Sequence, residues 1–189
     1  MNVYDFDKTI FYPDSSATFV RWESRRHPLY AALCVPGILC TLLLFKLKLI
    51  PKKIFKESLF RVIRASDDIP DDVKRFWDEY EGQMCSWYLK HKRSDDLIIS
   101  ASPEFLVKEM TDRLGVSLIA TNMDSSTSDI IGENCFGAEK VTRFYKSFPD
   151  GKIDEFYSDS LADAPLAALA DKAFLVTDKG QTPTPWPDK

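Results

Sequence analysis

The sequence is poor in the residues that build zinc fingers and disulfide frameworks. It has two histidines and four cysteines in 189 residues, and none of the cysteines form a C-x-x-C pair. That pattern contains no zinc-binding spacing. Dispersed cysteines among apolar neighbours are typical of reduced, buried side chains in a cytosolic protein. With only 7 glycines, the chain is not collagen-like or of low complexity. We therefore expect an ordered globular fold.

Positive charge is slightly outnumbered by negative charge overall, with 25 Lys and Arg against 29 Asp and Glu, but it is concentrated in one segment. The net charge of −4 and the pI of about 5.3 disfavour nucleic acid as a partner, because phosphate backbones bind clustered positive charge. Residues 21–64 carry 10 Lys and Arg against 2 acidic residues, a local charge of +8 that leaves −12 on the remainder. This asymmetry suggests a basic surface that meets an anionic partner, with solvated charge as the alternative.

The chain lacks a basic stretch followed by an apolar one at its amino terminus, so we expect no secretory signal. It has instead one long uncharged run, residues 28–45, with basic residues on both sides. The length of this run makes it a borderline transmembrane candidate. Pro36-Gly37 at its middle is expected to break or kink a single helix.

The spacing of apolar residues differs between the two halves of the chain. Residues 14–93 show helical spacing. Short apolar runs predict strands at residues 1–5, 96–100, 116–120, 153–157 and 173–176. Helices are expected between them at residues 103–114, 137–148 and 161–170, and an irregular tail at 181–189. Such alternation predicts a parallel sheet that binds its ligand at the carboxyl ends of the strands.

Reactive side chains follow three of these strands or open the helix behind Gly137. They are Asp5, Asp7, Ser100, Lys140, Asp159 and Asp163. In a parallel sheet they meet at one edge, which combines a nucleophile, an acid-base group, hydroxyl and ammonium donors, and carboxylates for a hard cation. This set predicts phosphoryl transfer. Taken singly, an aspartate can instead cap a helix, and a lysine can be a surface charge.

The run Asp5-Phe6-Asp7-Lys8-Thr9 matches the DxDxT signature of the haloacid dehalogenase superfamily. Ser100, Lys140 and the run SDSLAD at 158–163 supply the other three motifs in order. The chain thus resembles this superfamily, and its helical insert resembles the type I cap of the phosphoserine-phosphatase-like branch. The resemblance implies an α/β fold: a Rossmann-like parallel sheet with an all-helical cap inserted after the first strand.

The same resemblance implies a domain division and a set of residue roles. The catalytic core is expected in residues 1–13 and 94–189, and the cap in residues 14–93 with the apolar segment 28–45. Asp5 would be the nucleophile that forms an aspartyl-phosphate, and Asp7 would be the general acid and base. The resemblance also implies Mg²⁺, held by Asp5, the backbone carbonyl of Asp7, and Asp159.

The remaining motif residues are expected to hold the phosphate. Ser100 and Lys140 would bind its oxygens, and Thr9 would bind near it or stabilise the loop. Asp163 would support the site by orienting Lys140 or the ligands of the metal, with helix capping as the alternative. The family's phosphoserine branch commonly has Asn where this chain has Ala162, so that contact is missing here.

The apolar run 28–45 bears on the substrate. A single membrane crossing would separate Asp5 from Ser100 and Lys140, so the resemblance excludes it. A buried cap helix, a re-entrant hairpin bent at Pro36-Gly37, or an apolar surface in the membrane interface remain, and the basic flanks favour membrane contact. The runs at 25–39, 137–141 and 156–166 also resemble the phosphatidylglycerophosphatase C type of enzyme, which acts on a lipid phosphate.

The resulting expectation is a Mg²⁺-dependent phosphomonoester hydrolase that acts on a membrane lipid phosphate such as phosphatidylglycerophosphate. We expect it in the cytoplasm, peripheral on the inner face of the cell membrane, with an anionic membrane surface as partner and no nucleic acid. The first alternative is a soluble phosphoserine-phosphatase-like enzyme for a small metabolite. The second is an inactive membrane-associated binding protein.

Overall fold

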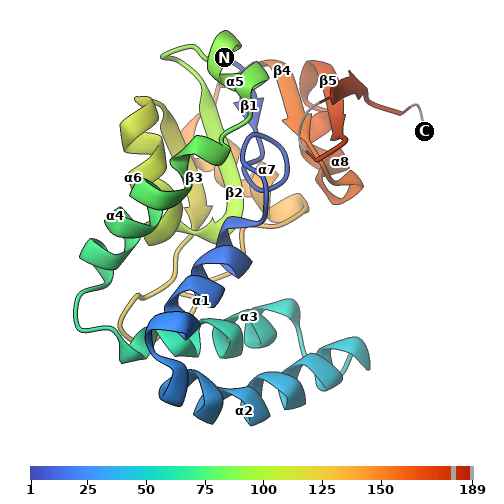
Figure 1. Ribbon diagram of the computed structural model, residues 1–189. Helices are drawn as coiled ribbons and strands as arrows, with labels where there is room; N and C mark the ends of the chain where they lie inside the picture. The colour runs from blue at the N-terminus through green and yellow to red at the C-terminus, as the bar shows by residue number, and fades with distance from the viewer. Residues whose placement is uncertain (180–181, 188–189) are drawn as a thin grey trace.

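One six-stranded sheet forms the centre of the computed structural model, which describes residues 1–179 and 182–187 (Figure 1). Its strand order is β3-β2-β1-β4-β5-β6, and every neighbouring pair is parallel except β5 with β6. The strands are β1 Val3–Tyr4, β2 Leu97–Pro103, β3 Ser117–Thr121, β4 Ile153–Ser158, β5 Ala170–Thr177 and β6 Thr182–Pro185. The predicted α/β fold class is confirmed.

The expectation of an irregular tail is wrong where β6 forms, and its residues 181, 188 and 189 lie outside the described part. Strand β6 carries two prolines but sits at the sheet edge, where a missing N–H removes no bond to a further strand. The helix expected over 161–170 is also shorter. It is divided into a 3₁₀ turn at Leu161–Asp163 and α8 at Ala164–Ala167, because β5 already starts at Ala170.

Helices cover both faces of the sheet. In chain order they are α1 Ser15–Arg26, α2 Pro28–Lys46, α3 Lys52–Phe60, α4 Ile69–Tyr80, α5 Ser86–His91, α6 Glu104–Leu114 and α7 Ala138–Ser147. Further 3₁₀ turns lie at Arg61–Ala65 and Glu81–Gln83. Because side chains alternate along a strand, Ile98 belongs to one buried cluster and its neighbours Leu97 and Ile99 to the other. Helices α4, α5 and α6 pack on the first face, and α7 and α8 on the second.

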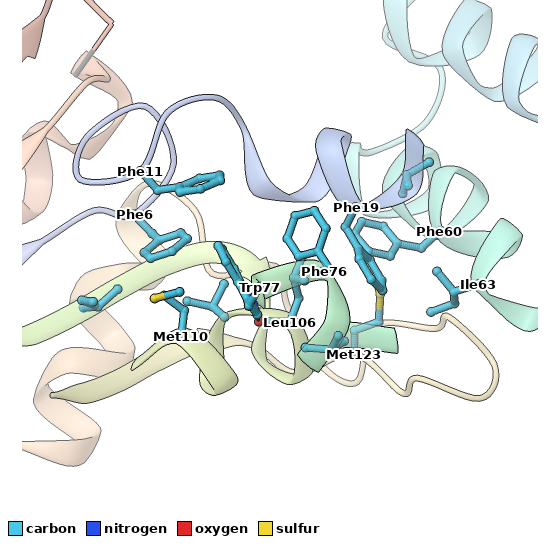
Figure 2. Close-up of a cluster of buried hydrophobic side chains, with 14 of the residues drawn as sticks. Phe6, Phe11, Phe19, Phe60, Ile63, Phe76, Trp77, Leu106, Met110 and Met123 are labelled. Atoms are coloured by element: carbon cyan, nitrogen blue, oxygen red, sulfur yellow. The ribbon is translucent and has the colours of Figure 1, made fainter. Parts of the chain in front are cut away.

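The larger cluster is rich in aromatic residues that join the sheet to the helical insert. Figure 2 shows Phe6 and Phe11 beside Trp77 of α4. The ring centres of Trp77 lie 5.8 Å from Phe6 and 5.1 Å from Phe11, and its indole N–H donates to the carbonyl of Leu106 at 2.7 Å. Part of the segment 14–93 therefore packs directly on the core. Its division from the core as a cap stays a prediction.

Helix α2 lies at the end of the molecule furthest from the sheet and packs beside α3 (Figure 1). None of its residues is buried, and it is long and apolar enough to cross a membrane by length and composition alone. The expected break at Pro36-Gly37 is wrong, because the helix runs continuously through Pro36. Proline removes a single backbone donor, and the chain reverses instead at 47–51, where α2 gives way to α3.

Two leucines on helices test whether α2 is free of core contacts. Leu106 on α6 is 0% exposed, whereas Leu33 on α2 is 78% exposed. We expect Leu106→Ala to lower the free energy of unfolding by about 2–5 kcal/mol, because it leaves a cavity. The matched change Leu33→Ala should stay within about 0.5 kcal/mol. Urea unfolding followed by circular dichroism measures both, and equal losses would mean that α2 is part of a core.

Candidate active site

A cavity of about 330 Å³ opens at the carboxyl ends of β1 and β4. Five of the residues singled out in the sequence line it: Asp5, Asp7, Lys140, Asp159 and Asp163. Each follows a strand or lies on the helix or turn behind one, so the parallel sheet brings together residues up to 158 positions apart. The predicted convergence at one sheet edge is therefore present.

The loop after β1 turns sharply and holds the first motif in place. The N–H of Asp5 donates to the carbonyl of Tyr157 at 2.8 Å, which extends the pairing of β1 with β4 by one residue. The carbonyl of Phe6 accepts the N–H groups of residues 9, 10 and 11. Lys8 has φ 60°, a left-handed conformation that is costly for a side-chain residue and clusters at functional sites. The turn presents both aspartates of the motif to the cavity.

A buried ion-pair network forms the base of the cavity. The Nζ of Lys140 lies 2.6 Å from Oδ1 of Asp5 and 2.6 Å from Oδ2 of Asp163. The hydroxyl of Ser158 donates to the same Asp163 oxygen at 2.8 Å. Gly137 precedes α7 with φ 60°, which glycine adopts without strain. Asp163 therefore contacts Lys140, and its role in orienting Lys140 stays a prediction.

The network carries more negative charge than Lys140 can balance. Burial raises the pKa of Asp5 to about 7, against the opposing attraction of Lys140, and Asp163 adds repulsion. For Lys140, burial acts to lower the pKa, but Asp5 and Asp163 outweigh it and hold the pKa above its ordinary value. Lys140 thus stays an ammonium group. A further cation beside Asp5 would favour the carboxylate form.

The hydrogen bonds and burial of the Asp7 carboxyl group suit it to exchange a proton. Its carboxylate accepts the N–H of Ser15 at 2.5 Å and the hydroxyl of Ser102 at 2.5 Å. Burial raises the pKa of Asp7 to about 6, and repulsion from Asp14 adds to the shift. A carboxyl group with a pKa near neutrality can both give and take a proton. Sequence reasoning missed Ser102, because the apolar run ends at Ile99 while β2 continues to Pro103.

Thr9 and Ser100 sit just behind the cavity lining. The Thr9 hydroxyl donates to Asp5 at 3.3 Å and accepts the N–H of Asp159 at 2.9 Å, so it joins the first and last motifs. Ser100 is buried, and its hydroxyl accepts the N–H of Ser102 at 3.0 Å. These contacts favour a bracing role for both hydroxyls. Their direct contact with phosphate stays a prediction.

The expected Mg²⁺ ligands form an oxygen-only donor set. Asp5 and Asp159, which would supply carboxylates, and Asp7, which would supply its backbone carbonyl, all line the cavity. Mg²⁺ prefers such oxygen ligands and keeps several waters. Burial raises the pKa of Asp159, as it does that of Asp5, so a cation bound by the two would favour the charged form of both carboxylates. The residues present therefore fit a divalent hard cation.

Lys56 of α3 is a cavity residue that the sequence indicated only as part of the basic segment. Its Nζ donates to the carbonyl of Ala101 and lies 3.3 Å from Oδ1 of Asn134. Burial lowers the pKa of Lys56 to about 8. The helical pattern around Lys56 did not indicate a functional residue, because the contacts of Lys56 with Ala101 and Asn134 depend on how α3 packs over the strand ends. Lys56 brings a second ammonium group to the cavity.

Helix α3 forms the outer wall of the cavity and connects it to α2. Phe55 and Leu59 of α3 line the cavity. The ring of Phe55 stacks on Phe45 of α2 with centres 5.6 Å apart. On the other side, Lys53 donates to the carbonyl of Gly132 at 2.7 Å, which ties α3 to the loop before α7. The cavity therefore has a charged base and an apolar wall that borders the exposed helix.

Known proteins share this sequence pattern and architecture. The family model described as haloacid dehalogenase-like hydrolase matches residues 3–168. Protein CicA of Caulobacter vibrioides is 24% identical over 187 residues, which cover 89% of this chain and 82% of CicA. A protein of unknown function from Bordetella pertussis Tohama I has a TM-score of 0.74 at 18% identity, over 93% of this chain and 89% of that one.

A phosphoserine phosphohydrolase-like protein from Francisella tularensis subsp. tularensis SCHU S4 has a TM-score of 0.55 at 19% identity, over 94% of this chain and 88% of that one. At these identities the two solved structures show a shared fold. The family match runs from β1 through α8 and includes each of the four motifs. The predicted superfamily and hydrolytic enzyme class are confirmed: the chain belongs to the haloacid dehalogenase-like hydrolase family.

Proposed function

We propose that this protein hydrolyses a phosphomonoester through an aspartyl-phosphate on Asp5, and that its substrate is a membrane lipid phosphate such as phosphatidylglycerophosphate. The observation that carries the proposal is one cavity with two unlike ends. Its base holds Asp5 beside the ammonium of Lys140, and its outer wall is α3, which packs on the exposed apolar helix α2. A phosphate could enter the base while its lipid portion stays near α2.

In the first step, a carboxylate oxygen of Asp5 attacks phosphorus and forms the acyl-phosphate bond, while the bond from phosphorus to the leaving oxygen breaks. Asp7 gives its proton to that oxygen, which leaves as an alcohol. The pKa of Asp7, raised to about 6 by burial, suits this exchange. Lys140 and Lys56, which both line the cavity, offset the negative charge on the phosphoryl oxygens.

In the second step, Asp7 is a carboxylate and removes a proton from water. The water oxygen attacks phosphorus, the acyl-phosphate bond breaks, and Asp5 returns as a carboxylate with inorganic phosphate released. Asp5, the Asp7 carbonyl and Asp159 would hold Mg²⁺, which when bound supplies charge stabilisation to the phosphoryl group. Asp163 keeps the Lys140 ammonium aimed at Asp5.

Membrane contact is supported by the surface of α2 and its surroundings. Leu29 is 84% and Leu39 60% exposed, and such a contiguous apolar surface marks an interaction site. Lys46, Lys48 and the lysines that open α3 lie beside it. Basic residues at the border of an apolar helix bind anionic headgroups. We therefore propose a peripheral position on the anionic inner face of the cell membrane.

The nucleophile is tested by Asp5→Asn. An amide is a far weaker nucleophile than a carboxylate, so hydrolysis of an aryl phosphate should fall by at least about a thousandfold. Release of the aryl alcohol measures the rate, and circular dichroism checks the fold. Asp112→Asn, at an exposed pair with Lys108 on α6, is the matched control and should keep full activity. Substantial turnover by Asp5→Asn would remove Asp5 from its role.

The charge of Lys56 should appear in the pH profile. Because its pKa is lowered to about 8, its ammonium attracts phosphate below pH 8 and is lost as pH rises above it. We expect kcat/KM for a phosphomonoester to fall above pH 8 in the unmodified protein. Lys56→Arg should carry activity to higher pH, since arginine stays charged. A profile identical in both proteins between pH 7 and 10 would contradict this role.

Membrane contact is tested by Leu33→Asp on α2, with Leu89→Asp on α5 as the matched control. Both leucines are exposed, at 78% and 47%, but α5 lies at the opposite end of the molecule (Figure 1). Sedimentation with phosphatidylglycerol vesicles at low salt measures binding. Leu33→Asp should weaken binding about tenfold to a hundredfold, the effect of losing one buried leucine.

Hydrolysis of phosphatidylglycerophosphate in the same vesicles should fall in parallel with the binding of Leu33→Asp. Its turnover of a soluble aryl phosphate should stay unchanged, because Leu33 does not line the cavity. If the unmodified protein fails to bind anionic vesicles, or if phosphoserine is hydrolysed faster than the lipid, the soluble alternative replaces the lipid proposal.

A further inference from the structure

A second cluster of titratable side chains lies outside the catalytic cavity, where α1 ends. Glu23 and His27 are four residues apart, so they share one face of the helix. Asp72, in the first turn of α4, lies opposite them. One ligand atom from each of the three residues lies within 4.8 Å of the other two. The Oε2 of Glu23 and the Nε2 of His27 are 3.6 Å apart.

Glu23 is the unusual member of this cluster, because it is 0% exposed. Within residues 1–179 and 182–187, no hydrogen bond reaches either of its carboxylate oxygens, or Nε2 of His27. Burial, reinforced by Asp72, raises the pKa of Glu23 to about 7. A buried carboxylate that accepts no hydrogen bond has lost its hydration without replacing it. The free atoms of the two side chains lie 3.6 Å apart, so one position is within reach of both.

Asp72 is held ready on the other side of that position. Arg26 donates to its Oδ1 at 2.6 Å, and the hydroxyl of Ser66 donates to its Oδ2 at 2.5 Å. Each carboxylate oxygen has two lone pairs, so both contacts can persist while one oxygen binds a cation. Donors that fix a ligand in this way are typical of the outer shell of metal sites.

We propose that Glu23, His27 and Asp72 bind a divalent transition-metal ion of the Zn²⁺ type. Imidazole with carboxylates suits Zn²⁺ and disfavours Mg²⁺, which takes oxygen ligands. Two ligands on a tetrahedral Zn²⁺ are roughly 3.4 Å apart, close to the 3.6 Å between Glu23 and His27. A cavity of about 200 Å³ lined by His27 and Asp72 gives the ion a route from solvent.

The site is separate from the proposed catalytic centre, because none of its three ligands lines the catalytic cavity. Its position gives it a structural effect. His27 is the residue between α1 and α2, so a metal bound to it and to Asp72 joins the start of the exposed helix to α4. The ion would thus fix how α2 leaves the body of the molecule.

The test is calorimetric titration of Zn²⁺ into the metal-free full chain, with excess Mg²⁺ to occupy the catalytic carboxylates. We expect one site whose affinity falls at least tenfold in Glu23→Gln, which keeps the side-chain shape, and in His27→Gln. The matched control is His91→Gln at the other histidine, which is exposed, and it should bind like the unmodified protein. Equal affinity in all four proteins would overturn the proposal.

A second measurement uses no variant, so it tests Zn²⁺ binding at His27 even if a substitution disturbs folding. In nitrogen-15 NMR of the unmodified protein, Zn²⁺ should shift the Nε2 resonance of His27 and leave that of His91 in place. The same titration with Mg²⁺ alone should shift neither. Unchanged His27 resonances at saturating Zn²⁺ would mean that the buried Glu23 is neutralised by a proton instead of a metal.

Discussion

The buried ammonium of Lys140 is the constraint on which the catalytic centre depends. A charge taken out of water is tolerated only with close partners, and removing one partner leaves an uncompensated charge. Its partners Asp5 and Asp163 come from the two ends of the sequence, after β1 and behind β4. The two ion pairs of Lys140 therefore hold α7, the first motif loop and the last motif turn close together. The same arrangement aims a positive group at the oxygen that we propose as nucleophile.

Some helices of the insert pack on the core, and others lie at the surface. Helix α4 supplies Trp77 to the aromatic cluster that covers the sheet, whereas no residue of α2 is fully buried. Helix α3 lies between them and contributes to both, because Lys56 reaches the cavity and Phe55 stacks on Phe45. An apolar helix left in water is unfavourable, so the exposure of α2 near the cavity supports the membrane contact that we propose.

The motif residues could be predicted because each follows a strand, and parallel strands end at one edge. Two further residues that line the cavity, Ser102 and Lys56, could not be predicted. Ser102 belongs to a strand that continues past its apolar run, and Lys56 reaches the site only through the packing of α3. The sequence likewise did not indicate the three residues that we propose as zinc ligands. Glu23 and His27 show helical spacing, but Asp72 joins them from another helix after an interval without a motif.

Local patterns determined the order of strands and helices, the four motifs and the length of the apolar segment, because these depend on spacing along the chain. Tertiary packing decided that the tail forms β6 at the edge of the sheet. Tertiary packing also decided which buried carboxylates gain a positively charged partner or a hydrogen-bond donor. Asp5 gains Lys140, whereas Glu23 gains no hydrogen-bond donor among the described residues. Burial and pairing are properties of several chain segments at once, so no single stretch of sequence encodes them.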